Sequence, residues 1–300
     1  MMTLKFNLIS NIKSIYRSLL SEIDRNYIQT SILATRIQRI NYSMFNDLRQ
    51  AELKVFSQNG EDGIIDYCLE TIGLKDINFL ELGSSDFVEC NSRFCNLIRN
   101  SGTYLVDSKM DIKKLTKNFE DRFINSKIYC KNTWVSKDNI NNIIREAKTK
   151  LGRINVLSID LDGNDYWIIK SIIDLDFDLI IVEYNPTLSA NLPVSVPYDP
   201  NFDRTKKHFT WKYYGATLEA YVEHLKKRNF KFIGATTQGT NAFFVNNVHA
   251  SKFQKVIKSV EVYKNVSSRE ARNREGILSF KSIEEERELI RDLHLEKTEI

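Results

Sequence analysis

The sequence predicts an α/β fold in which a doubly wound, mostly parallel sheet carries helices on both faces. Five apolar runs of four or five residues alternate with segments of helical periodicity between residues 79 and 182. The run at 155–159 is almost continuously apolar, as expected for a strand covered on both faces. Two further runs, at 230–234 and 242–245, enclose a turn rich in Gly, Thr and Asn, which predicts a closing antiparallel pair. We therefore expect one doubly wound domain over 55–248, a helical N-terminal extension at 1–54 and a C-terminal extension at 249–300.

Composition places the chain among ordinary globular proteins and excludes several classes. Charged residues make up 27% and hydrophobic residues 42%, and the net charge of +4 comes without any run of five basic residues, so no nucleic-acid partner is expected. The four cysteines form no Cys-x-x-Cys pair, which favours reduced thiols over a zinc site or a disulfide framework. Since no apolar stretch approaches about 18 residues and no signal-peptide core is present, we expect no transmembrane helix and a cytoplasmic location.

Residues 4–50 are predicted to be helical, because apolar side chains recur every three or four positions. This stripe comprises Leu8, Ile12, Ile15, Leu19 and Ile23. Basic residues cover much of the remaining surface, although Glu22 and Asp24 interrupt them. Two interpretations stay open: packing on the core or on a second copy of the chain, as in a homo-oligomer, and peripheral contact with an anionic membrane.

A polar turn at 56–63 leads into a helix, for which Ser57 or Asn59 is the expected cap. The strand at 79–82 then stops at Gly83, a helical face follows, and the strand at 103–106 ends on Asp107. Strand, glycine turn, helix, strand and acid are together typical of a nucleoside-binding unit. Gly83 lets the backbone approach a ligand closely, and Asp107 can accept hydrogen bonds from both hydroxyls of a ribose. A single glycine in place of Gly-x-Gly-x-x-Gly disfavours a dinucleotide.

Acidic residues lie at the ends of four of the five predicted parallel strands. Because the carboxyl ends of parallel strands meet at one edge of a sheet, we expect Glu81, Asp107, Asp160 and Glu183 to converge there. No Lys or Arg occurs in the turns after Glu81, Asp160 and Glu183, so ion pairing explains these acids poorly and a functional site is favoured.

Two long segments complete the chain. Residues 186–215 hold all four prolines of the chain and form a connection of a length typical of functional loops or lids. Residues 249–300 are charged and predicted to be helical, with 284–288 as a solvated face.

Two motifs resemble the FkbM-type family of class I S-adenosylmethionine (SAM)-dependent methyltransferases. Ser57-Gln58-x-Gly60-Glu61-Asp62 followed by the strand at 79–82 is similar to the opening of that family. The stretch from Asp160 to Asp165 is similar to its Asp-x-Glu-Gly-x-Glu motif, with aspartates at 162 and 165 in place of the glutamates. The resemblance covers about residues 55–248.

The resemblance implies a Rossmann-like class I methyltransferase fold, SAM as cofactor, and methyl transfer to a hydroxyl of a sugar or glycan precursor. It implies cofactor contacts from Gln58, Glu81, Gly83, Ser84 and Asp107. It implies an acceptor side formed by Asp160, Asp162, Asn164 and Glu183, with Asp160 as the first choice for the base. Asn185-Pro186 is followed by Thr187 rather than by the aromatic clamp of amino-group methyltransferases, which favours an oxygen acceptor.

Two other functions stay open. Asp160-x-Asp162 after a strand also resembles the metal-binding pair of nucleotide-sugar glycosyltransferases, and a SAM-type fold can serve as a non-catalytic binding module. The acidic loop is not an EF-hand, because its twelfth position is Ser171 instead of glutamate, and we assign no metal site from the sequence. The expected partner is a small-molecule or glycan acceptor.

Overall fold

A computed structural model describes the chain except for residues 1–25, 86, 113–126, 190, 264–269 and 299–300. The chain forms two compact units, Met1–Met44 and Phe45–Ile300. In the first unit, residues 26–41 form a helix that is followed by the 3₁₀ turn η1 (Tyr42–Met44). The predicted apolar stripe from Leu8 to Ile23 lies outside the described residues. The prediction of a helix as far as residue 50 is wrong, because a separate 3₁₀ turn, η2 (Leu48–Ala51), begins where the Asp47 side chain accepts from the Arg49 amide.

The second unit is built on a seven-stranded sheet in the order β3-β2-β1-β4-β5-β8-β7. Its strands are β1 (Asn78–Leu82), β2 (Gly102–Asp107), β3 (Ile128–Asn132), β4 (Val156–Ile159), β5 (Leu179–Glu183), β7 (Phe230–Ala235) and β8 (Asn241–Asn246). The first five pair in parallel, and β8 lies antiparallel between β5 and β7. This strand order is that of the class I methyltransferase fold, so the predicted fold class is confirmed.

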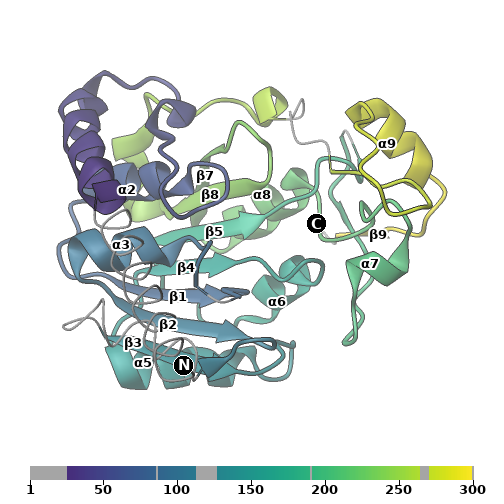
Figure 1. The fold of residues 1–300 in the computed structure, drawn as a ribbon, viewed down its shortest axis with the longest axis horizontal. Coiled ribbons are helices and arrows are strands. Elements are labelled where there is room, and N and C mark those ends of the chain that lie inside the picture. Colours follow the sequence, from purple (N-terminus) through teal and green to yellow (C-terminus); the bar gives the residue numbers. More distant parts are fainter. Residues whose placement is uncertain (1–25, 86, 113–126, 190, 264–269, 299–300) are drawn as a thin grey trace, which may run out of the picture. The chain divides into compact units, whose positions relative to one another are not determined.

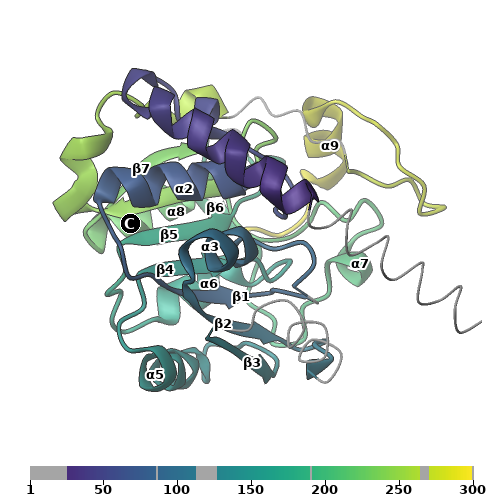
Figure 2. The ribbon, with the colours of Figure 1, turned by 60° about the vertical axis from the view of Figure 1, so that its left-hand side comes forward.

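Helices cover both faces of the sheet (Figure 2). On the near face of that view lie α2 (Glu61–Ile72) and α3 (Ser92–Arg99), and on the other face lie α5 (Ile140–Leu151), α6 (Asp165–Ser171) and α8 (Leu218–Lys227). Alternate strand residues point to the second face, where Leu82, Ile159 and Val182 pack with Ile143 and Tyr221 in one buried cluster. Each fully buried side chain of this size contributes roughly 1.5–3 kcal/mol to stability.

From β1 the chain adds β2 and β3 on one side and then β4 and β5 on the other, so strand order reverses between β1 and β4. In an open parallel sheet the ligand-binding crevice lies at this point. At that point the amide of Gly83 donates to the Val106 carbonyl of β2, at 2.8 Å. The amide of Asp160, just after β4, donates to the Leu82 carbonyl at 3.0 Å. The glycine turn and the first acid of the 160–165 loop therefore leave the sheet side by side.

A second small layer, which we name the cap, lies beyond the carboxyl ends of the parallel strands (Figure 1). It combines β6 (Val194–Ser195) and α7 (Arg204–Lys207) with α9 (Ile283–Ile290) and β9 (Glu296–Lys297). β6 and β9 pair antiparallel, and their flanking side chains form a separate apolar cluster. That cluster comprises Leu188, Val194, Val196, Phe202, Tyr214 and Ile290.

The described part of residues 249–300 is mostly not α-helical, which corrects the prediction. Before α9 it contains the 3₁₀ turns η3 (Asn247–Phe253) and η4 (Val260–Tyr263), and an isolated bridge joins Arg272 to Leu278. The solvated face predicted at 284–288 is also wrong at Glu286 of α9, a cap residue that is only 2% exposed.

Among the described residues, no helix combines the length and the apolar character that a membrane crossing requires.

Candidate functional site

The glycine turn after β1 touches the acidic loop after β4. Gly83 has φ +89°, and a Cβ atom built on it would lie 1.6 Å from the carbonyl oxygen of Asp160. Glycine is therefore required here by a neighbouring protein backbone, a reason additional to the close ligand approach that the sequence predicts. The consequence for the site is that the predicted cofactor turn and the predicted catalytic acid are in direct contact.

Glu81 organises the segment that follows the turn. Its carboxylate accepts from the amides of Asn91 (2.7 Å) and Ser92 (3.0 Å) and from the Ser92 hydroxyl. Burial raises the pKa of Glu81, and these hydrogen bonds oppose that shift. With these bonds in place, Glu81 shapes the loop that a cofactor would contact.

The other predicted cofactor residues differ in their burial and in the hydrogen bonds that they already make. Asp107 is half-buried and accepts from the amides of Ser85 (2.9 Å) and Lys109 (2.7 Å), which leaves one further lone pair on each oxygen. Ser84 is fully buried, and its hydroxyl has no hydrogen-bond partner among the described residues. Gln58 is exposed on the loop before α2, and no hydrogen bond described here joins it to the glycine turn.

The Ser-Gln-x-Gly-Glu-Asp segment is held by two acids whose roles the sequence did not reveal. The buried Asp62 Oδ2 accepts from the amides of Val55, Phe56 and Ser57 and from the Ser57 hydroxyl, at 2.7–2.8 Å. Gly60 stands at the N-cap position of α2 and offers no side-chain bond, while the Ser57 hydroxyl accepts from the Asp62 amide of the first turn at 3.0 Å. Ser57 therefore caps this amide from outside the N-cap position, and the alternative cap Asn59 is wrong. A separate hydrogen bond, from the side-chain Nδ2 of Asn241 to the Glu61 carboxylate at 2.7 Å, ties this segment to β8.

Three carboxylates gather where β4 and β5 end. One oxygen each from Asp160, Asp165 and Glu183 lies within 4.8 Å of the other two. Asp165 is buried at the start of α6 and accepts from the amides of Leu161 (2.7 Å) and Gly163 (3.0 Å), which fixes the loop. Glu183 has a buried Oε2 with no hydrogen-bond partner among the described residues. The predicted convergence of Asp160 and Glu183 therefore holds in the structure.

The crowding of these acids makes them hard to ionise together. Solvent still reaches the Asp160 side chain, but protein surrounds its carboxyl closely, and this loss of water together with the charges of Asp162 and Asp165 raises its pKa well above the ordinary value. Burial and the charge of Asp160 do the same to the pKa of Glu183. Burial also raises the pKa of Asp165 to about 6.

The cap supplies a cation to the acidic loop, where the local sequence contains none. Arg204 of α7 donates to Asp162 Oδ1 at 2.6 Å, approaches Glu270 at 3.7 Å and stacks on the Tyr214 ring at 4.0 Å. The Asp162 side chain is thus directed to the cap. Because Arg204 lies 42 residues away in the sequence, no local pattern indicated this pair.

Asn164 also joins the loop to the cap. Its side-chain amide donates to the Asp199 carbonyl at 2.7 Å, and its oxygen accepts from the Asp199 amide at 3.5 Å. Gly163 faces the Phe202 ring so closely that a Cβ would lie 2.2 Å from it. Among the four predicted acceptor-side residues, Asp160 and Glu183 face each other, while Asp162 and Asn164 hold the cap.

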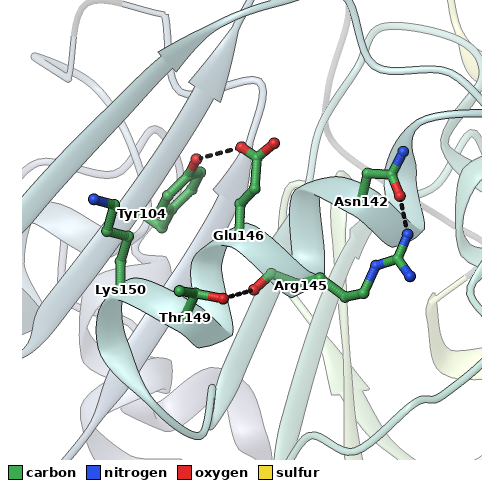
Figure 3. Close-up of a pocket in the computed structure, with 6 residues that line it drawn as sticks. All are labelled: Tyr104, Asn142, Arg145, Glu146, Thr149 and Lys150. Carbon is green, nitrogen blue, oxygen red and sulfur yellow. Dashed lines mark hydrogen bonds between the residues drawn. The ribbon is translucent and has the colours of Figure 1, made fainter.

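A surface pocket of about 440 Å³ lies elsewhere, between β2 and α5 (Figure 3). It is lined by Tyr104, Asn142, Arg145, Glu146, Thr149 and Lys150. Its polar groups bind one another, since the Tyr104 hydroxyl donates to Glu146 at 3.1 Å and Thr149 donates to the Arg145 carbonyl at 2.8 Å. None of the predicted site residues lines this pocket. We therefore place the candidate site at the ends of β4 and β5, where Asp160, Asp165 and Glu183 gather.

Comparison with known proteins adds little to this geometry. No family model matches the chain, and no curated protein sequence matches it. Among solved structures, the N-terminal domain of EvdMO1 with SAH bound is 8% identical, with 70% of this chain and 94% of that chain covered and a TM-score of 0.38. The SeMet-substituted CurJ carbon methyltransferase is 12% identical, with coverages of 77% and 69% and a TM-score of 0.35. Likenesses this weak support no inference about function, so the assignment of the fold rests on strand order and direction.

Proposed function

We propose that this chain is a SAM-dependent methyltransferase that transfers a methyl group to a hydroxyl oxygen, with a sugar or glycan precursor as acceptor. The observation that carries the proposal is the contact between the Gly83 turn and the Asp160 carbonyl at the point where strand order reverses. A ligand seated on the turn would have its reactive end beside the acid pair. Methyl transfer needs this proximity, because the methyl group moves in line between two held reactants.

The residues around the turn suit an adenosyl ligand with a sulfonium and an ammonium group. Asp107 keeps lone pairs for two ribose hydroxyls, and the buried Ser84 hydroxyl is available to a polar ligand atom. Carboxylates at the rim match the positive charge of the cofactor. Because its pKa is raised, Asp160 is suited to take a proton from an acceptor hydroxyl as the oxygen attacks the methyl group.

An oxygen acceptor fits better than an amine. The Asn185 side chain, fully buried after β5, donates to the carbonyls of Lys212 (2.8 Å) and Tyr214 (2.9 Å) and accepts from the Thr187 amide (2.9 Å). It is therefore occupied in holding the cap. The sugar or glycan nature of the acceptor rests on the family resemblance.

The glycosyltransferase alternative loses its main support. That chemistry requires Asp160 and Asp162 to share a metal ion, but the Asp162 carboxylate is engaged by Arg204.

Isothermal titration with SAM and with S-adenosylhomocysteine, in EDTA, tests the proposal. We expect one site per chain, weakened at least about 30-fold in Asp107→Ala, because loss of hydrogen bonds to a charged group costs about 2 kcal/mol or more. Asp174→Ala is the control, since this exposed acid lies before the amino end of β5, away from the carboxyl ends that carry the candidate site. No binding of either ligand, or equal weakening in both variants, would refute the assignment.

A further inference from the structure

We propose that Asp160, Asp165 and Glu183 together bind a divalent metal ion with a preference for oxygen ligands, such as Mn²⁺, Mg²⁺ or Ca²⁺. This inference goes beyond the sequence, from which we assigned no metal site, and it does not depend on methyl transfer. It rests on the geometry of the three carboxylates and on two buried polar atoms without partners, one in Glu183 and one in the neighbouring Tyr221.

The geometry allows one ion to contact all three side chains. Each contributes an oxygen within 4.8 Å of the other two, and metal–oxygen distances of about 2.0–2.6 Å let a central ion bridge such a spacing. Asp165 is held in place by two backbone amides, yet each of its oxygens keeps a second lone pair. The remaining two acids come from the ends of adjacent strands, β4 and β5.

The charge balance of the cluster is incomplete. Three carboxylates share one small volume. The nearby Arg204 donates to Asp162 and approaches Glu270, and its single charge also acts on Asp160 and Glu183, which does not balance three acids. Buried charges in proteins are normally paired or coordinate a metal. An ion at the centre would provide the additional positive charge that three neighbouring carboxylates require.

Two unsatisfied atoms point to a missing ligand. The buried Glu183 Oε2 has no hydrogen-bond donor among the described residues. The Tyr221 residue on α8 is 0% exposed, and its hydroxyl also lacks a partner within the described part of the chain. That hydroxyl lies close enough to Asp165, Glu183 and Asp160 for their charges to act on it. A bound ion would engage the glutamate oxygen, and its coordinated water would give the tyrosine a partner.

A bound ion would lower the pKa of the Asp160 carboxylate, so Asp160 would then hold the ion instead of taking the proton. A cation beside an acceptor hydroxyl would also favour its ionisation.

Direct binding of Mn²⁺ tests the inference without any adenosyl ligand. Protein is stripped with EDTA, exchanged into metal-free buffer and titrated with Mn²⁺ while the free ion is followed by electron paramagnetic resonance. We expect one Mn²⁺ per chain, displaced by Ca²⁺ or Mg²⁺. Glu183→Gln should raise the Kd at least about tenfold, because affinity follows the number of charged ligands. Asp162→Asn should change it less than about threefold, since this carboxylate lies outside the cluster.

Thermal unfolding tells loss of metal binding apart from loss of the folded structure. Without metal, Glu183→Gln should melt no lower than the parent protein, because the substitution removes a repelling charge. If Glu183→Gln does not fold, Asp160→Asn takes its place. The inference is overturned if the parent protein binds no Mn²⁺ up to millimolar concentration. It is also overturned if Asp162→Asn weakens binding as much as Glu183→Gln, since the ion would then occupy the Asp160–Asp162 pair.

Discussion

Replacing Gly83 by alanine tests whether the glycine turn is required by the packing of the protein itself. The new Cβ would lie 1.6 Å from the Asp160 carbonyl oxygen and 2.7 Å from its carbon, so the two backbones must separate. The hydrogen bonds at stake are those from Gly83 to Val106 (2.8 Å) and from Asp160 to Leu82 (3.0 Å). Weakening both costs about 2–4 kcal/mol, and a positive φ for alanine costs about 1–2 kcal/mol more. We expect a total loss of about 3–6 kcal/mol in the free energy of unfolding.

The matched control is Gly73→Ala. Gly73 ends helix α2 with φ +85°, but an added Cβ there would meet nothing within 4 Å. Its loss should therefore be limited to the conformational cost of about 1–2 kcal/mol. Urea unfolding of the three proteins, followed by tryptophan fluorescence, gives both values by linear extrapolation. If Gly83→Ala loses no more stability than Gly73→Ala, the close approach of Asp160 is not what requires the glycine.

Three further predictions concern stability and the cap. Arg99→Ala should lower the free energy of unfolding by about 3–5 kcal/mol, because it leaves Asp66, whose side chain is 1% exposed, without its 2.5 Å partner. Burial raises the pKa of Asp62 to about 6, so the folded protein holds this proton more tightly than the unfolded chain, and the stability of the parent protein should fall as pH rises from about 4 to about 7. That contribution, at most about 3 kcal/mol, should be absent in Asp62→Asn. Arg204→Gln should leave the Kd for SAM within about threefold but lower kcat/KM for the acceptor, since it loosens the cap on Asp162.

Each of these has its own control. Arg291→Ala removes an exposed pair with Glu288 and should cost less than about 1 kcal/mol, so equal losses at 99 and 291 would contradict the first prediction. For Asp62, the stability difference between variant and parent is followed by urea unfolding across pH, and a constant difference would exclude the proton linkage. For Arg204, a SAM affinity that falls together with kcat/KM would show that the residue supports the cofactor side instead.

Local sequence patterns predicted the sheet well because each strand carries its own signal. The runs at 79–82 and 155–159 are mostly apolar and are buried on both faces, and they became β1 and β4 with little change in bounds. The convergence of Asp160 and Glu183 followed from the strand ends alone, since parallel strands place them at one edge.

The cap could not be predicted in the same way. β6 and β9 are two residues each, and they pair across about a hundred residues of sequence, so neither shows a periodicity. Glu286 illustrates the problem: it stands in an acidic run, yet it is buried near the Thr187 hydroxyl (3.4 Å) and Lys212 (3.9 Å). Long-range polar pairs of this kind have no local sequence signature.

The pairing of β6 with β9 also affects when the site can form during synthesis. All seven strands of the sheet are available once Asn246 has been made, but Val194 and Ser195 must wait for Glu296 and Lys297. At about 5–20 residues per second, this delay is roughly 3–10 s. Throughout that interval the glycine turn and the acidic edge can be in place while the cap above them is incomplete. A nascent chain could therefore meet a small ligand before the cap has formed over the acidic strand ends.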